Sequence, residues 1–134
     1  MFEYATTVRL FDTDAAGVLF FGNQFRLAHA AYEEFMEVNG ICFDEILRDG
    51  RIMLPITKAE ADYQKPLHVG DRLTIEVRAE SITEHSYTLS FQLKKEDGSL
   101  AGHIRTVHVC VDARTWEKTP LSTALKDALQ SIHS

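Results

Sequence analysis

Residues 11–38 read FDTDAAGVLFFGNQFRLAHAAYEEFMEV and join an acidic turn, a run of small residues and a helical pattern. The helical part carries apolar residues at a spacing close to 3.6, namely Phe21, Phe25, Ala28, Tyr32, Phe35 and Met36. Leu27 and Ala31 widen this stripe, so we expect other elements to wrap most of the helix. We expect Asn23 to cap its start and Gly40 to end it, which predicts a helix of about four turns.

Two carboxylates precede the helical pattern within the acidic turn, which reads DTDAAG. Asp12 and Asp14 are separated by one residue, and the residues after them are too small to block a ligand. The start of a helix concentrates unpaired N–H groups and partial positive charge, which can stabilise a developing oxyanion. Aspartates also commonly organise turns through local hydrogen bonds between side chain and backbone. The pattern by itself favours that structural role.

The composition limits the classes of partner. A chain of 134 residues fits one domain with a single core. The formal net charge of −6 and the lack of a basic run argue against nucleic-acid and anionic-membrane partners. No apolar stretch approaches bilayer length, and Cys42 and Cys110 match no metal-ligand or redox spacing. We therefore expect a soluble cytoplasmic protein with buried free thiols.

Alternation of apolar and polar residues predicts strands on both sides of the long helix. The expected strands cover residues 2–11, 52–63, 73–80, 87–94 and 100–112. Glu96–Ser99 supplies a hairpin turn, whereas the last strand changes phase between Ile104 and Val107 and so needs a bulge or burial of both faces. Short helices are expected within 41–50 and after Pro120. One strand, the long helix and four strands in antiparallel succession predict an α+β fold, with a curved antiparallel sheet wrapped around one long central helix.

Several other catalytic classes lack their motifs. The six histidines form no HExxH or similar pairing, so we expect solvated or core histidines. No serine lies in a GxSxG elbow, and no glycine-rich loop opens a helix after a strand. Cys42 has no basic partner nearby in the sequence. The sequence thus predicts neither a metal ion nor another cofactor.

Four segments carry a family resemblance over nearly the whole chain. They are FDTDAAGVLFFGNQF, the AYEEF helix, the YQKPLHVGDRL turn and the VHVCVD strand. In this order they resemble the 4-hydroxybenzoyl-CoA thioesterase family of the hotdog superfamily, with the nearest likeness to its 1,4-dihydroxy-2-naphthoyl-CoA hydrolases. The resemblance implies a single hotdog thioesterase domain over residues 1–134, with a sheet curled around a long helix.

The resemblance also implies roles for residues in the turn and at the helix start. The family's catalytic aspartate matches Asp14, and its oxyanion contact is a backbone amide that matches Phe21. Gly17 and Phe20 then become substrate-binding residues beside the reacting carbonyl. Asp12 matches the first aspartate of the pair, for which we expect a structural role.

Contacts to the coenzyme are less well defined by the resemblance. Lys58 matches a lysine in a related short-chain acyl-CoA branch, and a solvated strand residue is the competing interpretation. In the 4-hydroxybenzoyl branch a basic cluster that helps hold the CoA phosphates matches Thr83–His85, which is not basic here. We therefore expect rearranged contacts to the CoA phosphates.

The implied activity is hydrolysis of an aromatic acyl-CoA, with 1,4-dihydroxy-2-naphthoyl-CoA as the favoured substrate. Asp14 would act as nucleophile or as general base, and the sequence does not separate these two roles. A thiolate is a stable leaving group, so one carboxylate and one oxyanion donor could suffice without a metal. The family further implies a homodimer or homotetramer with the site at the subunit interface.

Alternative functions remain open at this level. 4-Hydroxybenzoyl-CoA or a short-chain acyl-CoA are other substrates of the same reaction class. An acyl-thioester dehydratase shares the hotdog fold but needs a histidine before the helix, and residues 14–23 contain none. A non-catalytic acyl-CoA-binding module would use the same groove without turnover.

Overall fold

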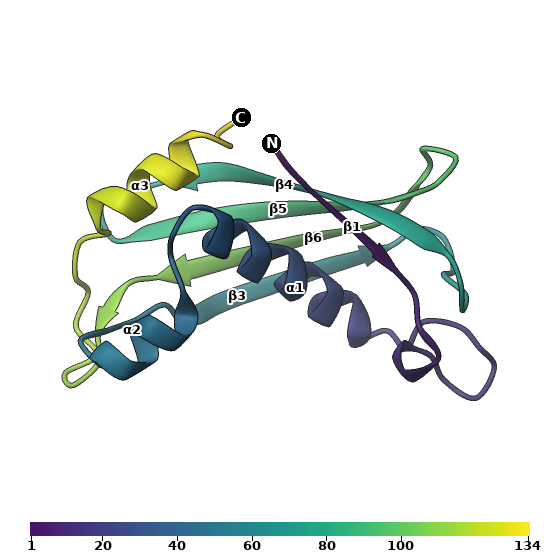
Figure 1. The fold of residues 1–134 in the computed structure, drawn as a ribbon, viewed down its shortest axis with the longest axis horizontal. Helices are drawn as coiled ribbons and strands as arrows, with labels where there is room; N and C mark the ends of the chain where they lie inside the picture. The colour runs from purple at the N-terminus through teal and green to yellow at the C-terminus, as the bar shows by residue number, and fades with distance from the viewer.

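The computed structural model describes all residues from 1 to 134, and it places one long helix on the concave side of a curved antiparallel sheet (Figure 1). The main sheet contains β1 (Phe2–Thr7), β3 (Ile56–Tyr63), β4 (Arg72–Ile82), β5 (Ser86–Lys95) and β6 (Leu100–Val109). A separate small sheet contains β2 (Ile52–Met53) and β7 (Val111–Asp112). The helices are α1 (Asn23–Val38), α2 (Phe43–Asp49) and α3 (Thr123–Gln130), and a 3-10 turn forms η1 (Leu10–Asp12). This arrangement confirms the predicted α+β fold.

The strand order is β1-β4-β5-β6-β3, and every neighbouring pair is antiparallel. β4, β5 and β6 follow one another as predicted, and Gly98 adopts a φ of +85° in the hairpin turn. β3 instead pairs with β6 at the far edge, so the chain crosses one end of the sheet between β3 and β4. The expected succession of four strands is therefore right for three of them and wrong for β3. Side-chain alternation specifies the faces of a strand but not its neighbours.

The helix α1 covers the concave face of the sheet. Its buried residues are Gln24, Leu27, Ala28, Ala31, Tyr32, Phe35 and Met36. All of them except Gln24 belong to the same hydrophobic core as Ile75 of β4, Phe91 of β5 and Ile104 of β6. The helix spans 16 residues, which confirms the predicted length.

The two ends of α1 agree with the sequence to different degrees. Gly22 occupies the N-cap position and Asn23 is the first helical residue, so the predicted cap is wrong. The Asn23 side chain instead donates from Nδ2 to the carbonyl oxygen of Asp12 at 2.8 Å, which ties the helix to the turn before it. At the other end Gly40 has a φ of +78°, and its N–H donates to the Glu37 carbonyl oxygen at 2.9 Å. That left-handed end confirms the prediction.

The predicted change of phase in the last strand does not occur. Ala101 is buried, and from Gly102 onward the buried residues of β6 keep one phase with Ile104, Thr106 and His108. Val107 and Val109 lie on the opposite, half-buried face. The pairing of β5 with β6 is instead irregular at Ala101. Leu93 pairs with Gly102 and Lys94 pairs with Leu100, so Ala101 between them has no partner. The polar side chains of Thr106 and His108 therefore face the core, where the sequence pattern had predicted Val107 and Val109.

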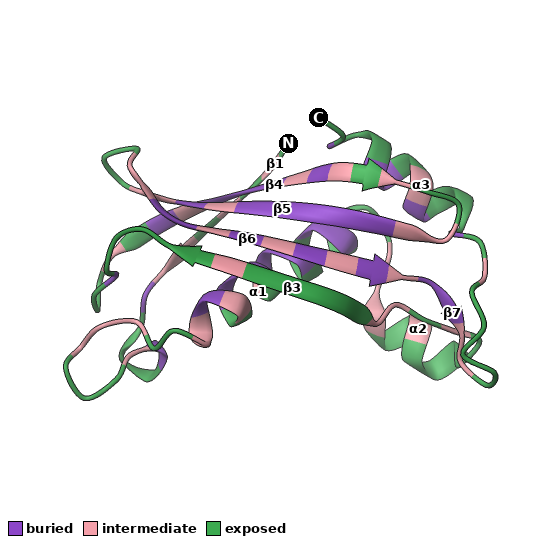
Figure 2. Cartoon of the chain, turned by 180° about the vertical axis from the view of Figure 1, so that it is seen from behind, coloured by how far each residue is buried: buried purple, intermediate pink, exposed green.

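Two predicted strands are shorter than expected. β1 stops at Thr7; the Val8 N–H still donates to the Asp71 carbonyl oxygen at 2.9 Å, and the chain then leaves the sheet and enters η1. Residues 52–63 divide into β2 and β3 at Pro55, which has no N–H for a ladder. β3 is an edge strand and is exposed over almost its whole length (Figure 2).

Two further features concern the expectations from composition. None of the three helices combines the length and the apolar character needed to span a membrane. Both cysteines are free thiols; Cys110 is buried and Cys42 is half-buried, so the expected burial is right for Cys110 only. Burial raises the pKa of the Cys110 thiol.

Candidate active site

Asp12 is the buried centre of the turn before α1, with 1% of its surface exposed. Its carboxylate accepts a hydrogen bond from the Arg9 backbone N–H at 2.9 Å and pairs with the Arg26 guanidinium. Its carbonyl oxygen accepts from the Phe20 N–H at 3.0 Å and from the Asn23 side chain. These contacts join η1, the loop and the helix, which agrees with the structural role expected for Asp12.

Asp14 lies in the same loop but is exposed. Its Oδ1 accepts hydrogen bonds from the N–H groups of Ala16 at 2.8 Å and Val18 at 3.3 Å. Its own N–H donates to the Val18 carbonyl oxygen at 2.9 Å, which closes the loop. Oδ2 has no hydrogen-bond partner within the chain. One oxygen thus fixes the carboxylate, and the other is free to act on a ligand.

The start of α1 presents two backbone donors that the chain leaves unpaired. The carbonyl oxygens of Phe20, Phe21 and Gly22 accept from the N–H groups three residues later, at 2.8, 3.4 and 3.2 Å. In a trans peptide the N–H points away from the preceding carbonyl. The N–H groups of Phe21 and Gly22 therefore point out of the helix start, where neither has an acceptor. Together with the helix dipole they can polarise a carbonyl oxygen.

Tyr63 and Gln24 anchor this helix start to the end of β3. The Tyr63 hydroxyl donates to the Phe21 carbonyl oxygen at 2.7 Å, and Gln24 Nε2 donates to the Asp62 carbonyl oxygen at 3.1 Å. Gln24 is 1% exposed. Sequence reasoning missed both residues, because their partners are backbone atoms about 40 positions away.

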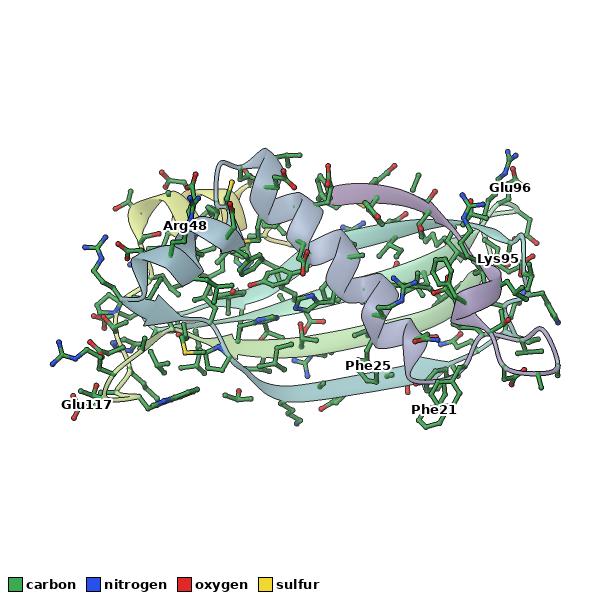
Figure 3. All side chains as sticks on the ribbon, turned by 60° about the horizontal axis from the view of Figure 1, so that its bottom comes forward. Phe21, Phe25, Arg48, Lys95, Glu96 and Glu117 are labelled. Carbon is green, nitrogen blue, oxygen red and sulfur yellow. The ribbon has the colours of Figure 1, made fainter.

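A cavity of about 350 Å³ opens beside the Phe21 carbonyl, between the loop and the β3–β4 connection. Its walls come from Val18, Leu19, Phe21, Gln24, Tyr63, Gln64, Lys65, Pro66 and Leu67. The wall is mostly apolar, and Lys65 is its single basic side chain. Asp14 does not line it. The loop joins Asp14 to Phe21 in the sequence, and Phe21 lies beside β3 (Figure 3).

The other predicted site residues differ in where the fold places them. Gly17 turns the loop with a φ of +77°, and open space surrounds the position that a Cβ would take. The rings of Phe20 and Phe21 lie 4.7 Å apart between centroids at the helix start, and both are exposed. Lys58 pairs with Val107 in the register of β3 and β6, on the convex face of the sheet, and its Nζ contacts Glu60 Oε1 at 2.8 Å. Lys58 does not line the cavity beside Phe21.

A buried polar cluster lies under the middle of α1. The hydroxyls of Tyr32 and Tyr87 lie 2.5 Å apart, and His108 Nε2 lies 2.8 Å from Thr106 Oγ1. The His108 ring stacks on Tyr87 with centroids 4.8 Å apart. Its Nδ1 has no hydrogen-bond partner in the chain.

Burial sets the protonation of this cluster. Burial, with a smaller contribution from the charge of His29, lowers the pKa of His108 to about 4. Burial also raises the pKa of both Tyr32 and Tyr87. At neutral pH all three side chains are therefore uncharged. A second cavity of about 350 Å³ adjoins Tyr32, Thr106 and His108 and opens between α1 and β3.

The sequence contained a signal for this cluster. Thr106 and His108 share the phase of Gly102 and Ile104, so polar residues at buried positions of the last strand could have been read from alternation. Of the six histidines, His108 is the buried one, and no group of three or more His, Cys, Asp or Glu side chains is placed to hold a metal ion.

Comparison with known proteins places this geometry in a family context. The sequence model of the thioesterase-like superfamily matches residues 8–129. The chain is 36% identical to 1,4-dihydroxy-2-naphthoyl-CoA hydrolase of Rippkaea orientalis, over 100% of this chain and 99% of the relative. It is 41% identical to the hydrolase of the same name from Prochlorococcus marinus, over 87% and 81% of the two chains.

Solved structures share the fold over almost the whole length. The crystal structure of Slr0204, a 1,4-dihydroxy-2-naphthoyl-CoA thioesterase from Synechocystis, superposes with a TM-score of 0.93 at 29% identity, over 98% of this chain and 96% of that one. A putative thioesterase from Prochlorococcus marinus superposes with a TM-score of 0.89 at 30% identity, over 97% and 94% of the two chains. These matches confirm the predicted hotdog fold. The chain belongs to the thioesterase-like superfamily.

Proposed function

We propose that the protein hydrolyses the thioester of 1,4-dihydroxy-2-naphthoyl-CoA to the free acid and CoA. The observation that carries the proposal is the loop before α1, where the free Oδ2 of Asp14 and the unpaired N–H of Phe21 lie in one short segment. Full-length relatives that carry the name of this activity support the choice of substrate.

Asp14 supplies the carboxylate of the reaction. As a nucleophile, its Oδ2 adds to the thioester carbonyl, the CoA thiolate leaves, and water then hydrolyses the mixed anhydride to release the acid. As a general base, it takes a proton from a water molecule, whose oxygen adds to the same carbonyl. In both routes the thiolate gains a proton to give free CoA.

The helix start would stabilise the oxyanion that forms in either route. The Phe21 N–H is the main donor, and the helix dipole adds partial positive charge at the same point. The exposed Phe20 and Phe21 rings offer an apolar surface for an aromatic acyl group. Gly17 keeps the approach open because no side chain fills the space above it.

We also propose that the active unit is a homodimer or homotetramer with the site at a subunit interface. β3 is an unpaired edge strand whose exposed apolar residues include Ile56 and Tyr63. Asp14 is exposed, and the cavity beside Phe21 does not include it, so a second copy at this edge would enclose the site. Sedimentation should give a species larger than 15.2 kDa at micromolar concentration. A stable monomer with full turnover would overturn the assembly.

A thioester panel tests the activity. Release of free CoA thiol is measured for 1,4-dihydroxy-2-naphthoyl-CoA, 4-hydroxybenzoyl-CoA and a short aliphatic acyl-CoA. We expect the highest kcat/KM for the first, and an aliphatic preference would refute the aromatic assignment. Binding of all three without turnover would identify a non-catalytic module. After a single turnover in water labelled with oxygen-18, label in the Asp14 carboxylate would identify the nucleophilic route, with water adding to the Asp14 carbonyl of the anhydride.

A further inference from the structure

A hollow of about 640 Å³ lies on the β1 side of the helix start, away from the cavity beside Phe21. Its walls come from the end of β1, the η1 turn, the first turn of α1, the start of β4 and the β5–β6 turn. Glu96, in that last turn, projects at the same end of the molecule as Phe21 (Figure 3). Asp12 also lines the hollow, and it lies two residues before Asp14 of the proposed active site.

Three arginines from separate elements line this hollow, namely Arg9, Arg26 and Arg72. The Arg9 guanidinium has no ion-pair partner in the chain. Arg72 lies 3.8 Å from Glu96, and both side chains are about three-quarters exposed, so this pair is weak in water. The lining also contains two acidic residues, Asp12 and Glu96. With three arginines and two carboxylates, the net charge of the lining is +1.

This positive charge is unusual in a chain with a formal net charge of −6. The single carboxylate that is buried here, Asp12, is already paired with Arg26. An arginine presents a planar fork of donors that fits a phosphate group, so the free fork of Arg9 and the exchangeable fork of Arg72 suit an anionic ligand.

An exposed aromatic ring completes the hollow. Phe11 is 78% exposed, and the Arg26 guanidinium lies 5.8 Å from its ring centroid. Aromatic rings and arginine planes next to a basic groove stack nucleobases, because every base has a flat π-face. The residues thus combine phosphate recognition with a platform for a base.

We infer that this hollow, which we call the arginine hollow, binds the phosphorylated adenosine end of CoA. Arg9 and Arg72 contact the phosphates, and Phe11 stacks the adenine. This inference rests on the proposed acyl-CoA substrate, and it supplies the phosphate contacts that Thr83–His85 lacks.

The position of the arginine hollow fits the length of the coenzyme. Asp12 lines it, and Asp14 follows two residues later, so their Cα atoms are at most about 7.6 Å apart. The extended pantetheine arm can span from the arginine hollow to the loop. One ligand could therefore place its nucleotide on Arg9 and Arg72 and its thioester at Asp14.

The test compares charge-removing variants on two forms of the substrate. The double variant Arg9→Gln/Arg72→Gln removes the proposed phosphate contacts, while Arg26 stays in place to hold Asp12. The control Arg48→Gln/Arg114→Gln removes the same charge from exposed residues at the opposite end of the molecule. Each protein is assayed on the acyl-CoA and on the corresponding acyl-pantetheine, which has no phosphate, and its affinity for free CoA is measured by calorimetry.

We expect the hollow variant to lower the ratio of kcat/KM between acyl-CoA and acyl-pantetheine by about 10- to 100-fold, since each lost arginine–phosphate contact is worth roughly tenfold. The Kd for CoA should rise by the same factor, and the control should change neither value. An unchanged Kd for CoA in a folded hollow variant would overturn the inference. The same loss in Lys65→Gln instead would assign the phosphates to the cavity beside Phe21.

The outcome is independent of the proposed hydrolysis. If no thioester is cleaved but the Kd for CoA depends on Arg9 and Arg72, the arginine hollow is confirmed and the proposed function fails. If hydrolysis is efficient but the Kd for CoA is the same with and without the two arginines, the proposed function stands and the arginine hollow fails.

Discussion

A Cβ atom on Gly102 would lie 2.6 Å from Oε1 of Gln24, so the glycine of β6 leaves the space that the buried glutamine of α1 fills. The whole Gln24 carboxamide lies within 2.8 Å of that position. The same carboxamide donates to the Asp62 carbonyl oxygen of β3. This contact fixes the height of the helix start above two strands, and the Phe21 amide is carried on that helix start.

We expect Gly102→Ala to lower the free energy of unfolding by about 1 to 3 kcal/mol, because the added methyl group displaces a side chain that has no solvent to move into. Urea denaturation measures the change. In a Gln24→Ala background the space is empty, so the same substitution should cost much less. If the two substitutions are additive, the glycine has another role.

The parts of this fold that local pattern determines could be predicted from the sequence. The apolar stripe from Phe21 to Met36 fixed the helix, since only a 3.6-residue period places these side chains on one face. The Glu96–Ser99 turn between two alternating strands fixed the hairpin. The loop before α1 could be assigned because Asp12, Asp14 and Gly17 form a short contiguous motif.

The parts that depend on distant partners could not be predicted. Nothing local to β3 indicates that it pairs with β6 rather than β4. Asn23 has the composition of a helix cap, yet the Asp12 carbonyl competes successfully for its side chain. Tyr63 and Gln24 join the site through backbone atoms of segments that are far away in the sequence.

Replacement of Asp14 by Asn should lower kcat by about 100- to 10,000-fold, the range for loss of a positioned catalytic group, with KM largely kept. The change preserves shape but removes the charge that a nucleophile or base needs. Steady-state kinetics on the aromatic acyl-CoA measures it. A folded Asp14→Asn enzyme with near-full turnover would remove Asp14 from the mechanism.

Asp12→Asn is the matched control for that variant, because it removes the same charge two residues away. Asp12 is buried and paired with Arg26, so we expect a loss of about 1 to 3 kcal/mol in the free energy of unfolding and a smaller effect on kcat. A general electrostatic effect on binding of the polyanionic coenzyme would appear in both variants. The roles are distinguished if stability falls in one and turnover in the other.

Tyr63→Phe should lower kcat by about 2- to 10-fold with little change in KM, since it removes one hydrogen bond of ordinary strength. The Tyr63 hydroxyl orients the Phe21 carbonyl. This carbonyl shares a peptide group with the unpaired N–H of Gly22, and the preceding peptide group carries the unpaired N–H of Phe21. Tyr4→Phe is the control, because the Tyr4 hydroxyl has no hydrogen-bond partner in the chain. Equal effects of the two variants would show that the contact does not position the oxyanion donors.

Stability should fall as the pH drops from about 6.5 to about 4, because His108 is buried in an uncharged form. In this window the unfolded chain takes up a proton at the imidazole, whereas the folded protein does not until its lowered pKa of about 4 is reached. Protons bound only by the unfolded state favour unfolding. The full contribution, present above pH 6.5, is on the order of 3 kcal/mol.

The comparison of His108→Gln with the wild type isolates this contribution from that of the carboxylates that titrate in the same range. Glutamine cannot take up a proton, and it keeps a polar group near Thr106 Oγ1, the partner of His108 Nε2. We expect the variant to be less stable at pH 7 but to lose less stability between pH 6.5 and 4, measured by urea denaturation at each pH. The exposed His133→Gln should follow the wild-type profile. Parallel profiles for wild type and His108→Gln would show that His108 is not the group whose protonation destabilises the fold.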